Sequence, residues 1–279
     1  MAVYSVSERW AIIDRCESKL ALGEALDDMD YIQLVQCINV STMQDKLEDF
    51  YAISSSMFDN PRCQARSKCA ETICAHCYVK REARKKNMFN ALDVNYKVFN
   101  TFDIPVKYWA ILPIPSVNGN ARIEAHGDTG NVLHAVNYIR IVKSHKNLHF
   151  TPWSKNAIDW APAFAQEGKP KNLTFVWSSI LPNVVDMPKE YVNGYPFAKY
   201  VDHVFTVFDK EVAISKHLFI NCGEYTANYE KVSHKCKDCM RCYWVPNRKR
   251  RKSKAYLRNL EILGLEDRGT DYYIFELRK

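Results

Sequence analysis

The chain has 279 residues, of which 47% are hydrophobic and 25% charged, and its formal net charge is +7. These values are typical of a soluble globular protein that buries a substantial core, as one large domain or two small ones. No apolar run approaches the ~18 residues of a membrane-spanning helix, and the N-terminus lacks the apolar core of a signal peptide. We therefore expect a cytoplasmic protein with no membrane partner.

The first 50 residues predict a helical N-terminal segment, because apolar residues alternate with charged ones at helical spacing. We expect residues 51–279 to form a single α/β domain that carries two cysteine clusters. Cys16 and Cys37 fall on the apolar faces of the predicted helices, so we place both in the hydrophobic core.

The next segments alternate between loop, helix and strand signals. Residues 54–61 end in Asn-Pro and predict a loop before the first cysteine cluster. Apolar residues lie roughly on one side of a basic stretch over 78–99, which predicts a helix. The short apolar run 108–114 follows Pro105 and is consistent with a buried strand.

A βαβ unit gives the clearest pattern in the chain. Residues 121–126 predict a strand, 127–131 a tight turn with helix-capping residues, 132–145 an amphipathic helix, and 148–151 a second strand. A strand, a helix and a strand within about 30 residues imply parallel strands joined by a right-handed crossover.

The remaining segments repeat this alternation more loosely. We predict helices over 160–166 and 255–263, strands over 172–178, 203–208, 216–222 and 272–277, and a proline-rich connection over 182–196. Gly264 is placed to end the last helix. The fold class that follows is α/β, with a largely parallel sheet and flanking helices. The pattern does not distinguish an open sheet from a partial or distorted barrel.

Eight of the ten cysteines fall into two groups. Clustered thiols in a reducing compartment bind metal more often than they form disulfides. The candidate metal ligands are Cys63, Cys69, Cys74 and Cys77 upstream, and Cys222, Cys236, Cys239 and Cys242 near the C-terminus.

The terminal group contains three cysteines at uninterrupted two-residue spacing, Cys236-x2-Cys239-x2-Cys242. This spacing favours an iron–sulfur cluster, as in the bacterial ferredoxin run, whereas zinc sites more often use two separate C-x2-C pairs. Zinc stays the alternative. Cys222 and His234 are the two candidates for a fourth ligand. The stretch 224–233 separates Cys222 from the other three cysteines, which makes Cys222 the least certain ligand of the four.

The upstream group, Cys69-x4-Cys74-x2-Cys77, is one residue longer than the C-x3-C-x2-C loop of radical S-adenosylmethionine enzymes. In those enzymes one iron stays open for the amino and carboxylate groups of the cofactor. Two alternatives follow here. Cys63 is a fourth ligand and closes the cluster, or Cys63 is free and the site is open.

Polar residues recur at the ends of the predicted strands, where parallel α/β folds bind their ligands. The candidate catalytic residues are Glu124, His126, Asp128 and Lys155. The candidate cofactor-binding residues are Gly127, Asp128, Asn131, Ser178 and Asn221. The turn from Gly127 could also accept a phosphate at a helix N-terminus. For each residue alone, turn capping is the competing interpretation.

Two basic runs follow the cysteine clusters, Lys80–Lys86 after the first and Arg248–Lys254 after the second. Each is either a solvated face or an anion site for nucleic acid, a nucleotide phosphate or an acidic partner. A solvated face is the more common interpretation of such a run, but the position of both runs after a cysteine cluster gives the anion site more weight than either run alone would.

As a set, the motifs between about residues 40 and 245 resemble the "gene product eighty-eight" family of bacteriophages and mobile elements. The motifs are Ile73-Cys-Ala-His-Cys-Tyr78, Arg122-Ile-Glu-Ala-His-Gly-Asp128, Asn137-Tyr138, Thr151-Pro-Trp-Ser-Lys-Asn156, Val204-Phe-Thr-Val207, Ile220-Asn-Cys-Gly223 and Cys239-Met-Arg-Cys-Tyr243. The resemblance implies a phage or integrated-element origin and a bacterial host cell. It also implies a cysteine pattern similar to that of radical S-adenosylmethionine-like proteins.

We therefore expect one or two iron–sulfur clusters, of the 4Fe-4S type, in an enzyme that acts on a nucleotide or nucleic acid, with S-adenosylmethionine as a possible cofactor. Two other functions stay open. The protein could be a metal-stabilised nucleic-acid-binding protein without catalysis, in which the basic runs contact phosphates. It could also be an interaction protein that binds a host factor.

Overall fold

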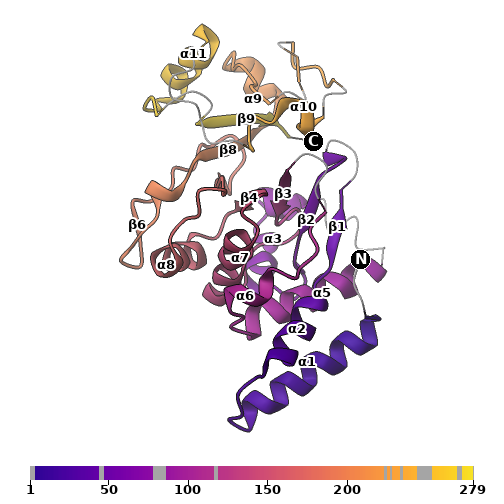
Figure 1. The fold of residues 1–279 in the computed structure, drawn as a ribbon. Helices are drawn as coiled ribbons and strands as arrows, with labels where there is room; N and C mark the ends of the chain where they lie inside the picture. Colours follow the sequence, from indigo (N-terminus) through magenta and orange to yellow (C-terminus); the bar gives the residue numbers. More distant parts are fainter. Residues whose placement is uncertain are drawn as a thin grey trace.

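The structure is a computed structural model that describes residues 4–43, 47–77, 86–115, 119–222, 225–226, 228–232, 235–243, 253–268 and 272–278. These residues form an α/β fold in which helices flank a seven-stranded, mostly parallel sheet, so the predicted fold class is confirmed (Figure 1). Within the described part of the chain, no helix is long and apolar enough to cross a membrane.

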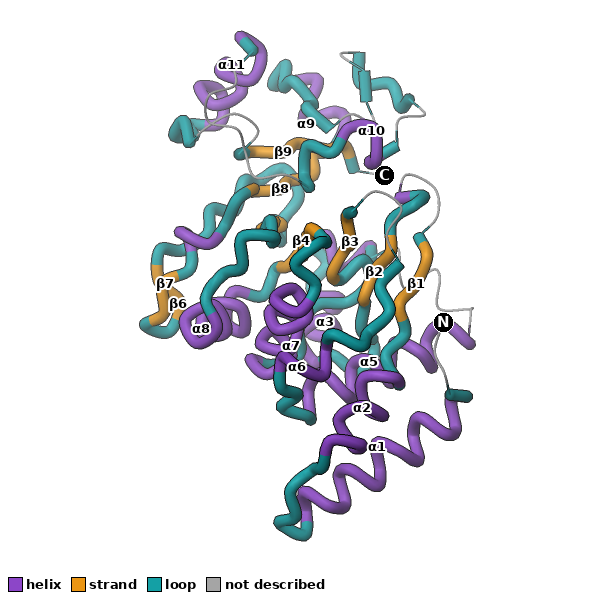
Figure 2. Tube along the Cα trace, viewed as in Figure 1, coloured by secondary structure: helices purple, strands orange, loops and turns teal. Residues whose placement is uncertain are grey.

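The sheet keeps its strands in chain order. The strands are β1 (Val40–Thr42), β2 (Tyr51–Ile53), β3 (Asn120–Ile123), β4 (His149–Ser154), β5 (Val176–Ser178), β8 (His203–Phe208) and β9 (Tyr273–Leu277). Only β1 is antiparallel to its neighbour, and the six strands from β2 to β9 are parallel. β1 and β9 are the two edges, so the sheet is open (Figure 2). The order has no reversal of the kind that marks a doubly wound sheet.

Helices follow most of the strands. They are α1 (Val6–Ala21), α2 (Asp28–Gln36), α3 (Pro61–Lys68), α5 (Lys86–Thr101), α6 (Val106–Trp109), α7 (Val132–Ser144), α8 (Ala157–Glu167), α9 (Lys210–Ser215), α10 (Cys236–Cys239) and α11 (Lys254–Leu263). The short 3-10 helices are η2 (Ile73–His76) and η3 (Ala198–Tyr200), and β6 (Tyr191–Val192) and β7 (Tyr195–Pro196) form a separate hairpin. Figure 1 shows α9, α10 and α11 gathered around β8 and β9, at the end of the molecule far from α1.

The two faces of the sheet have different neighbours, because successive strand residues point to opposite sides. Val204 and Phe208 of β8 belong to the main core, which also holds the buried residues of α7 and α8. Phe205 belongs instead to a smaller cluster with Val176 and Ile274. We call the side of this smaller cluster the opposite face, and it is where the terminal cysteines lie.

The βαβ unit is confirmed as β3, α7 and β4, with β3 and β4 parallel. The predicted helices at the N-terminus are α1 and α2, although β1 also falls within the first 50 residues. Cys16 and Cys37 are fully buried, as predicted. Gly264 ends α11 with a positive φ of 63°, a conformation that favours glycine.

Two predicted strands are wrong. Residues 108–114 lie in α6 and the turn after it, and Trp109 and Leu112 are buried at helical spacing. A short apolar run does not separate a buried strand from a buried helical turn. Residues 216–222 form no strand, because α9 extends to Ser215 and His217 then turns the chain with a φ of 49°.

The segment after His217 nevertheless runs beside β9. Asn221 Nδ2 donates to the Tyr273 carbonyl (2.7 Å), and Asn221 Oδ1 accepts from the Phe275 N–H (2.6 Å). The Cys222 N–H donates to the Phe275 carbonyl (3.0 Å). The side chain of Asn221 thus makes the hydrogen bonds that a neighbouring strand would make through its backbone. These bonds place Cys222 against the last strand of the sheet.

Candidate metal centre

The upstream cysteines lie on a segment that follows β2 and crosses the carboxyl ends of the parallel strands. Asn60 caps α3, because its Oδ1 accepts from the N–H groups of Arg62 and Cys63. Its Nδ2 donates to the backbone carbonyls of Asp128 (2.7 Å) and Thr129 (3.1 Å). The predicted loop signal Asn-Pro is therefore a helix start, with proline at the first helical position. Asn60 ties this helix to the turn after β3.

Two arginines one helical turn apart fix α3 to the ends of β3 and β4 and to the first turn of α8. Arg66 forms an ion pair with Asp128 (3.3 Å) and donates to the Lys155 carbonyl (2.8 Å). Arg62 pairs with Asp159 at 2.6 Å. Both carboxylates are almost fully buried, and an unpaired buried charge is costly, so these pairs constrain where α3 lies.

Asp128 is the group around which the strand ends are organised. Its Oδ1 accepts from Ser154 Oγ (2.6 Å) and the Thr129 N–H (2.9 Å). Its Oδ2 accepts from the Lys155 N–H (3.0 Å) and faces Arg66. An ionised carboxylate offers about four acceptor positions, so the protein itself occupies them. Asp128 therefore positions the β3 and β4 ends, rather than offering a free base.

Cys63 and Cys74 lie beside these groups. Burial raises the pKa of the Cys63 thiol, Asp128 and Glu124 raise it further, and Arg66 opposes them. Burial also raises the pKa of the Cys74 thiol, and Lys155 and Arg66 oppose it. We give the name strand-end site to five of these residues: Cys63, Arg66, Cys74, Asp128 and Lys155. Glu124 is not part of it.

The segment with Cys74 extends farther along the same edge of the sheet. The Ile73 N–H donates to the Ile180 carbonyl (3.0 Å), just beyond β5. Cys74 and Cys77 are half-buried, and Cys69 is exposed. Charge on Cys77 affects the Cys74 thiol, so these two lie close together. The structure thus brings Cys63, Cys74 and Cys77 to the strand ends.

Glu124 is buried in a hydrogen-bond network behind this edge. Its carboxyl oxygens accept from the Ser55 N–H (3.1 Å), Ser55 Oγ (2.6 Å) and the Tyr138 hydroxyl (2.7 Å). Burial raises its pKa to about 8, against the opposing effect of these hydrogen bonds. Its φ of 56° is unusual for a residue other than glycine.

His134 lies next to this network in its neutral form, and its Nε2 makes no hydrogen bond to it. Its Nδ1 accepts from the Gly130 N–H (3.2 Å) and lies 3.1 Å from Asn100 Nδ2, so the proton belongs on Nε2. Nε2 lies 3.5 Å from Glu124 Oε1. Burial lowers the pKa of His134 to about 3, which keeps the ring uncharged at neutral pH.

Gly127 makes a close approach that a side chain would disrupt. A Cβ there would lie 2.5 Å from the Ser55 carbonyl, and its φ is +87°. We expect Gly127→Ala to lower the free energy of unfolding by at least about 2 kcal/mol more than Gly168→Ala does. Gly168 also has a positive φ (+71°), but nothing lies within 4 Å of its Cβ position. Urea unfolding of both variants measures the difference, and equal losses would contradict the close approach.

The other predicted strand-end residues have separate positions. His126 is half-buried on the same turn as Gly127, and its N–H donates to Ser54 Oγ (3.3 Å). Asn131 caps α7 through the His134 N–H, at 2.9 Å. Ser178 is buried at the end of β5. Asn221 bonds to β9, three strands from β4, or roughly 14 Å across the sheet.

The terminal cysteines form a second neighbourhood. Cys236 and Cys239 begin and end α10, so their spacing puts them on one side of a helical turn. Met240, with a φ of 51°, redirects the chain toward Cys242. Burial raises the pKa of the Cys242 thiol well above its ordinary value, and Cys222, Cys236 and Cys239 raise it further. Such interactions act over roughly 10 Å. We call these four thiols the terminal cysteine site.

The segment 235–243 carries this site across the opposite face of the sheet. Cys242 packs against the cluster of Val176, Phe205 and Ile274. Arg241 donates to the Asn221 carbonyl beside β9. At the other side, the Tyr243 ring lies 4.6 Å from the Phe50 ring, next to β2. On this one face, the segment therefore reaches from the neighbourhood of β9, at one edge of the sheet, to the neighbourhood of β2, near the other edge.

Among the residues that the structure describes, no three His, Cys, Asp or Glu side chains are drawn together around one ion. The donor chemistry nevertheless fits a metal centre. Cys222, Cys236 and Cys239 all act on the Cys242 thiol, and cysteine thiols are the ligands that iron–sulfur clusters and structural zinc use.

Several predicted features lie outside the described residues. These are His234, residues 80–85 of the first basic run, and residues 248–252 of the second. The predicted helix over 78–99 corresponds to α5 in its described part, which begins at Lys86.

Several residues that hold the strand-end site and the Glu124 network in place were not predicted from the sequence. Arg62 and Arg66 were available as a signal, because they lie at helical spacing on either side of Cys63. Ser55 had no such signal, since it lies 69 residues from its partner Glu124.

Comparison with known proteins adds no relative to this geometry: no protein-family model, no curated protein and no solved structure matches the chain.

Proposed function

We propose that this chain is an iron–sulfur protein of phage or mobile-element origin, and an enzyme that acts on a nucleotide or nucleic acid. The single observation that carries the proposal is the gathering of four half-buried cysteines, in which Cys222, Cys236 and Cys239 all act on the Cys242 thiol. Three of these cysteines come from one short segment, and the fourth comes from a segment beside β9. A chain gathers four thiols from distant segments at a structural cost, which a bound metal offsets.

In this proposal Cys222, Cys236, Cys239 and Cys242 hold one cluster. The upstream cysteines Cys63, Cys69, Cys74 and Cys77 are the candidates for another. When bound, such a cluster supplies one-electron transfer.

The neighbours of the upstream cysteines suit an electron-rich centre. Lys155 and Arg66 both act on the Cys74 thiol and favour its thiolate form. Arg66 is held by Asp128, so its charge stays in place. The carboxyl ends of parallel strands are where α/β folds bind substrates. We therefore expect a substrate, and S-adenosylmethionine if it is used, to bind at the strand-end site.

Anaerobic purification followed by iron, acid-labile sulfide and zinc analysis tests this proposal. We expect a brown protein that contains iron and sulfide in equal amounts. A colourless protein with one or two zinc ions would overturn the iron–sulfur assignment and favour a metal-stabilised binding protein. In that case, nucleic-acid affinity that falls steeply with salt would identify its partner.

A further inference from the structure

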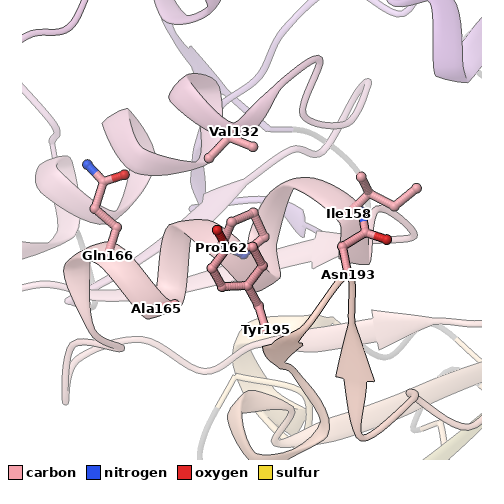
Figure 3. A pocket seen from close by; sticks show the side chains of 7 residues that line it. All are labelled: Val132, Ile158, Pro162, Ala165, Gln166, Asn193 and Tyr195. Atoms are coloured by element: carbon pink, nitrogen blue, oxygen red, sulfur yellow. The ribbon is translucent and has the colours of Figure 1, made fainter.

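A pocket of about 580 Å³ lies between α8 and the β6–β7 hairpin. Its lining residues are Val132, Ile158, Pro162, Ala165, Gln166, Asn193 and Tyr195. Ligand pockets for small molecules commonly enclose 300–1,000 Å³, estimated roughly. In the view of Figure 3, Gln166 lies at one end and Ile158 and Asn193 at the other, with Pro162 and Tyr195 between them.

The pocket begins next to the strand-end site. Val132 is the first residue of α7, four positions after Asp128, and Ile158 is the second residue of α8, three positions after Lys155. From Ile158 the pocket extends along α8 to Gln166, which is about 12 Å at 1.5 Å per residue. A ligand in the pocket would therefore have one end close to Lys155 and Asp128.

The wall formed by the hairpin is suited to a planar ring. Asn193 and Gly194 have positive φ angles of 50° and 81°, which is typical of a tight two-residue hairpin turn. This turn holds Tyr195, which is 44% exposed, over the pocket. Pro162 and Ala165 form an apolar floor. An exposed tyrosine over an apolar floor can stack a base, and the Gln166 amide offers both a donor and an acceptor to the base edge.

The Ile158 end is suited to an anion. α8 has 11 residues, and the side chain of its N-cap residue, Asn156, makes no capping hydrogen bond. The Asp159 N–H donates to the Asn156 carbonyl (3.3 Å), so this end offers an anion the N–H groups of Ala157 and Ile158 and the positive end of the helix dipole. The one carboxylate of the first turn, Asp159, is already paired with Arg62. Asn193 adds an amide at the same end of the pocket.

From this combination we infer that the pocket binds a nucleotide, with its base between Tyr195 and Pro162 and its phosphate toward Ile158. The inference rests on the proposed function, and it names the substrate class for the strand-end site. A nucleotide in this orientation has its phosphate at the end of the pocket nearer to Lys155. The same chemistry is available from a free nucleotide and from the end of a single strand.

Calorimetric titration of the full chain tests this inference, with a nucleoside monophosphate, the matching nucleoside, inorganic phosphate and a short single-stranded oligonucleotide as probes. We expect the monophosphate to bind more tightly than the nucleoside or the phosphate alone. Tyr195→Ala should weaken its binding by roughly tenfold or more. Ala165→Trp, at an exposed position that lines the pocket, should also block binding.

Tyr191→Ala is the matched control. Tyr191 is a tyrosine on the same hairpin, it is 57% exposed, and it does not line the pocket. We expect this variant to bind as the unaltered chain does. Equal losses in the Tyr191 and Tyr195 variants, normal binding by Ala165→Trp, or no binding of any probe that contains a base would overturn the inference. Binding of the oligonucleotide alone, still dependent on Tyr195, would assign the pocket to a strand end.

Iron and sulfide analysis of the same samples separates this inference from the proposed function. A colourless protein that binds nucleotides through Tyr195 would retain the pocket and remove the iron–sulfur assignment. A brown protein that binds no nucleotide would do the reverse.

Discussion

The Cys239→Ser protein should lose the metal of the terminal cysteine site and unfold far more readily than the unaltered chain. We expect the free energy of unfolding to fall by at least about 4 kcal/mol, a loss that single substitutions reach mainly when they remove a metal, a disulfide or a core side chain. The reason is that metal binding is coupled to folding of the ligand segments. Metal analysis and urea unfolding under anaerobic conditions measure both effects.

Cys37→Ser is the matched control, because burial alone predicts the opposite ranking. Cys37 is fully buried and lies in the main core, whereas Cys239 is half-buried in α10. Placing a hydroxyl at position 37 should cost ~1–3 kcal/mol and leave the metal content unchanged. If Cys239→Ser keeps its metal and is the more stable of the two variants, Cys239 is not a ligand.

The part of the fold that the sequence predicts best is the part with the strongest local pattern. β3, α7 and β4 each carry a clear periodicity, and the short links between them force a parallel crossover. The wrong strand over 108–114 had only an apolar run to support it. The segment 216–222 was wrong for another reason: Asn221 bonds to β9 through its side chain, a contact that leaves no pattern in the sequence.

The site was predictable to the extent that sheet geometry alone brings residues together. Asp128 and Lys155 follow neighbouring parallel strands, so their convergence follows from the strand assignment. The contact of Arg66 with Asp128 was not predictable in the same way. The two residues are 62 positions apart in the sequence, and Arg66 lies on α3, a helix with no buried residue to indicate how it packs. Such a contact depends on how α3 lies on the sheet, which local propensity does not determine.

The two cysteine sites share β4, although they lie on different parts of the molecule. Trp153 and Cys242 pack against the same cluster on the opposite face of the sheet. Lys155, two residues farther along the chain, acts on the Cys74 thiol at the strand ends. This strand therefore contacts both cysteine sites, one through Trp153 and the other through Lys155.

The stability of the protein should fall as the pH rises from about 6.5 to about 9, and Glu124 should account for most of the fall, whereas below about pH 6.5 the lowered pKa of the buried His134 has the opposite effect. Its pKa is raised from 4.5 to about 8, with burial as the largest cause. A carboxyl with a raised pKa in the folded state contributes stability that is complete below its unfolded pKa. That contribution is lost as the pH rises through the folded pKa. The difference between the two pKa values corresponds to an energy on the order of 5 kcal/mol.

Glu124→Gln isolates this contribution, because glutamine has the shape of the protonated acid and does not titrate. We expect this variant to be nearly as stable as the unaltered chain at about pH 5 and more stable than the unaltered chain at about pH 7 and above, because its own stability should change little between about pH 6.5 and pH 9. Urea unfolding at each pH measures the stability, and Glu211→Gln, which alters an exposed carboxylate, is the control.

A loss of stability at every pH would instead show that Glu124 is ionised in the folded protein. Ser55 and Tyr138 direct three donors at the Glu124 oxygens. If these donors keep Glu124 ionised, a glutamine amide would face one of them. The variant would then be strongly destabilised at every pH, and Glu124 would be a buried anion rather than a stored proton.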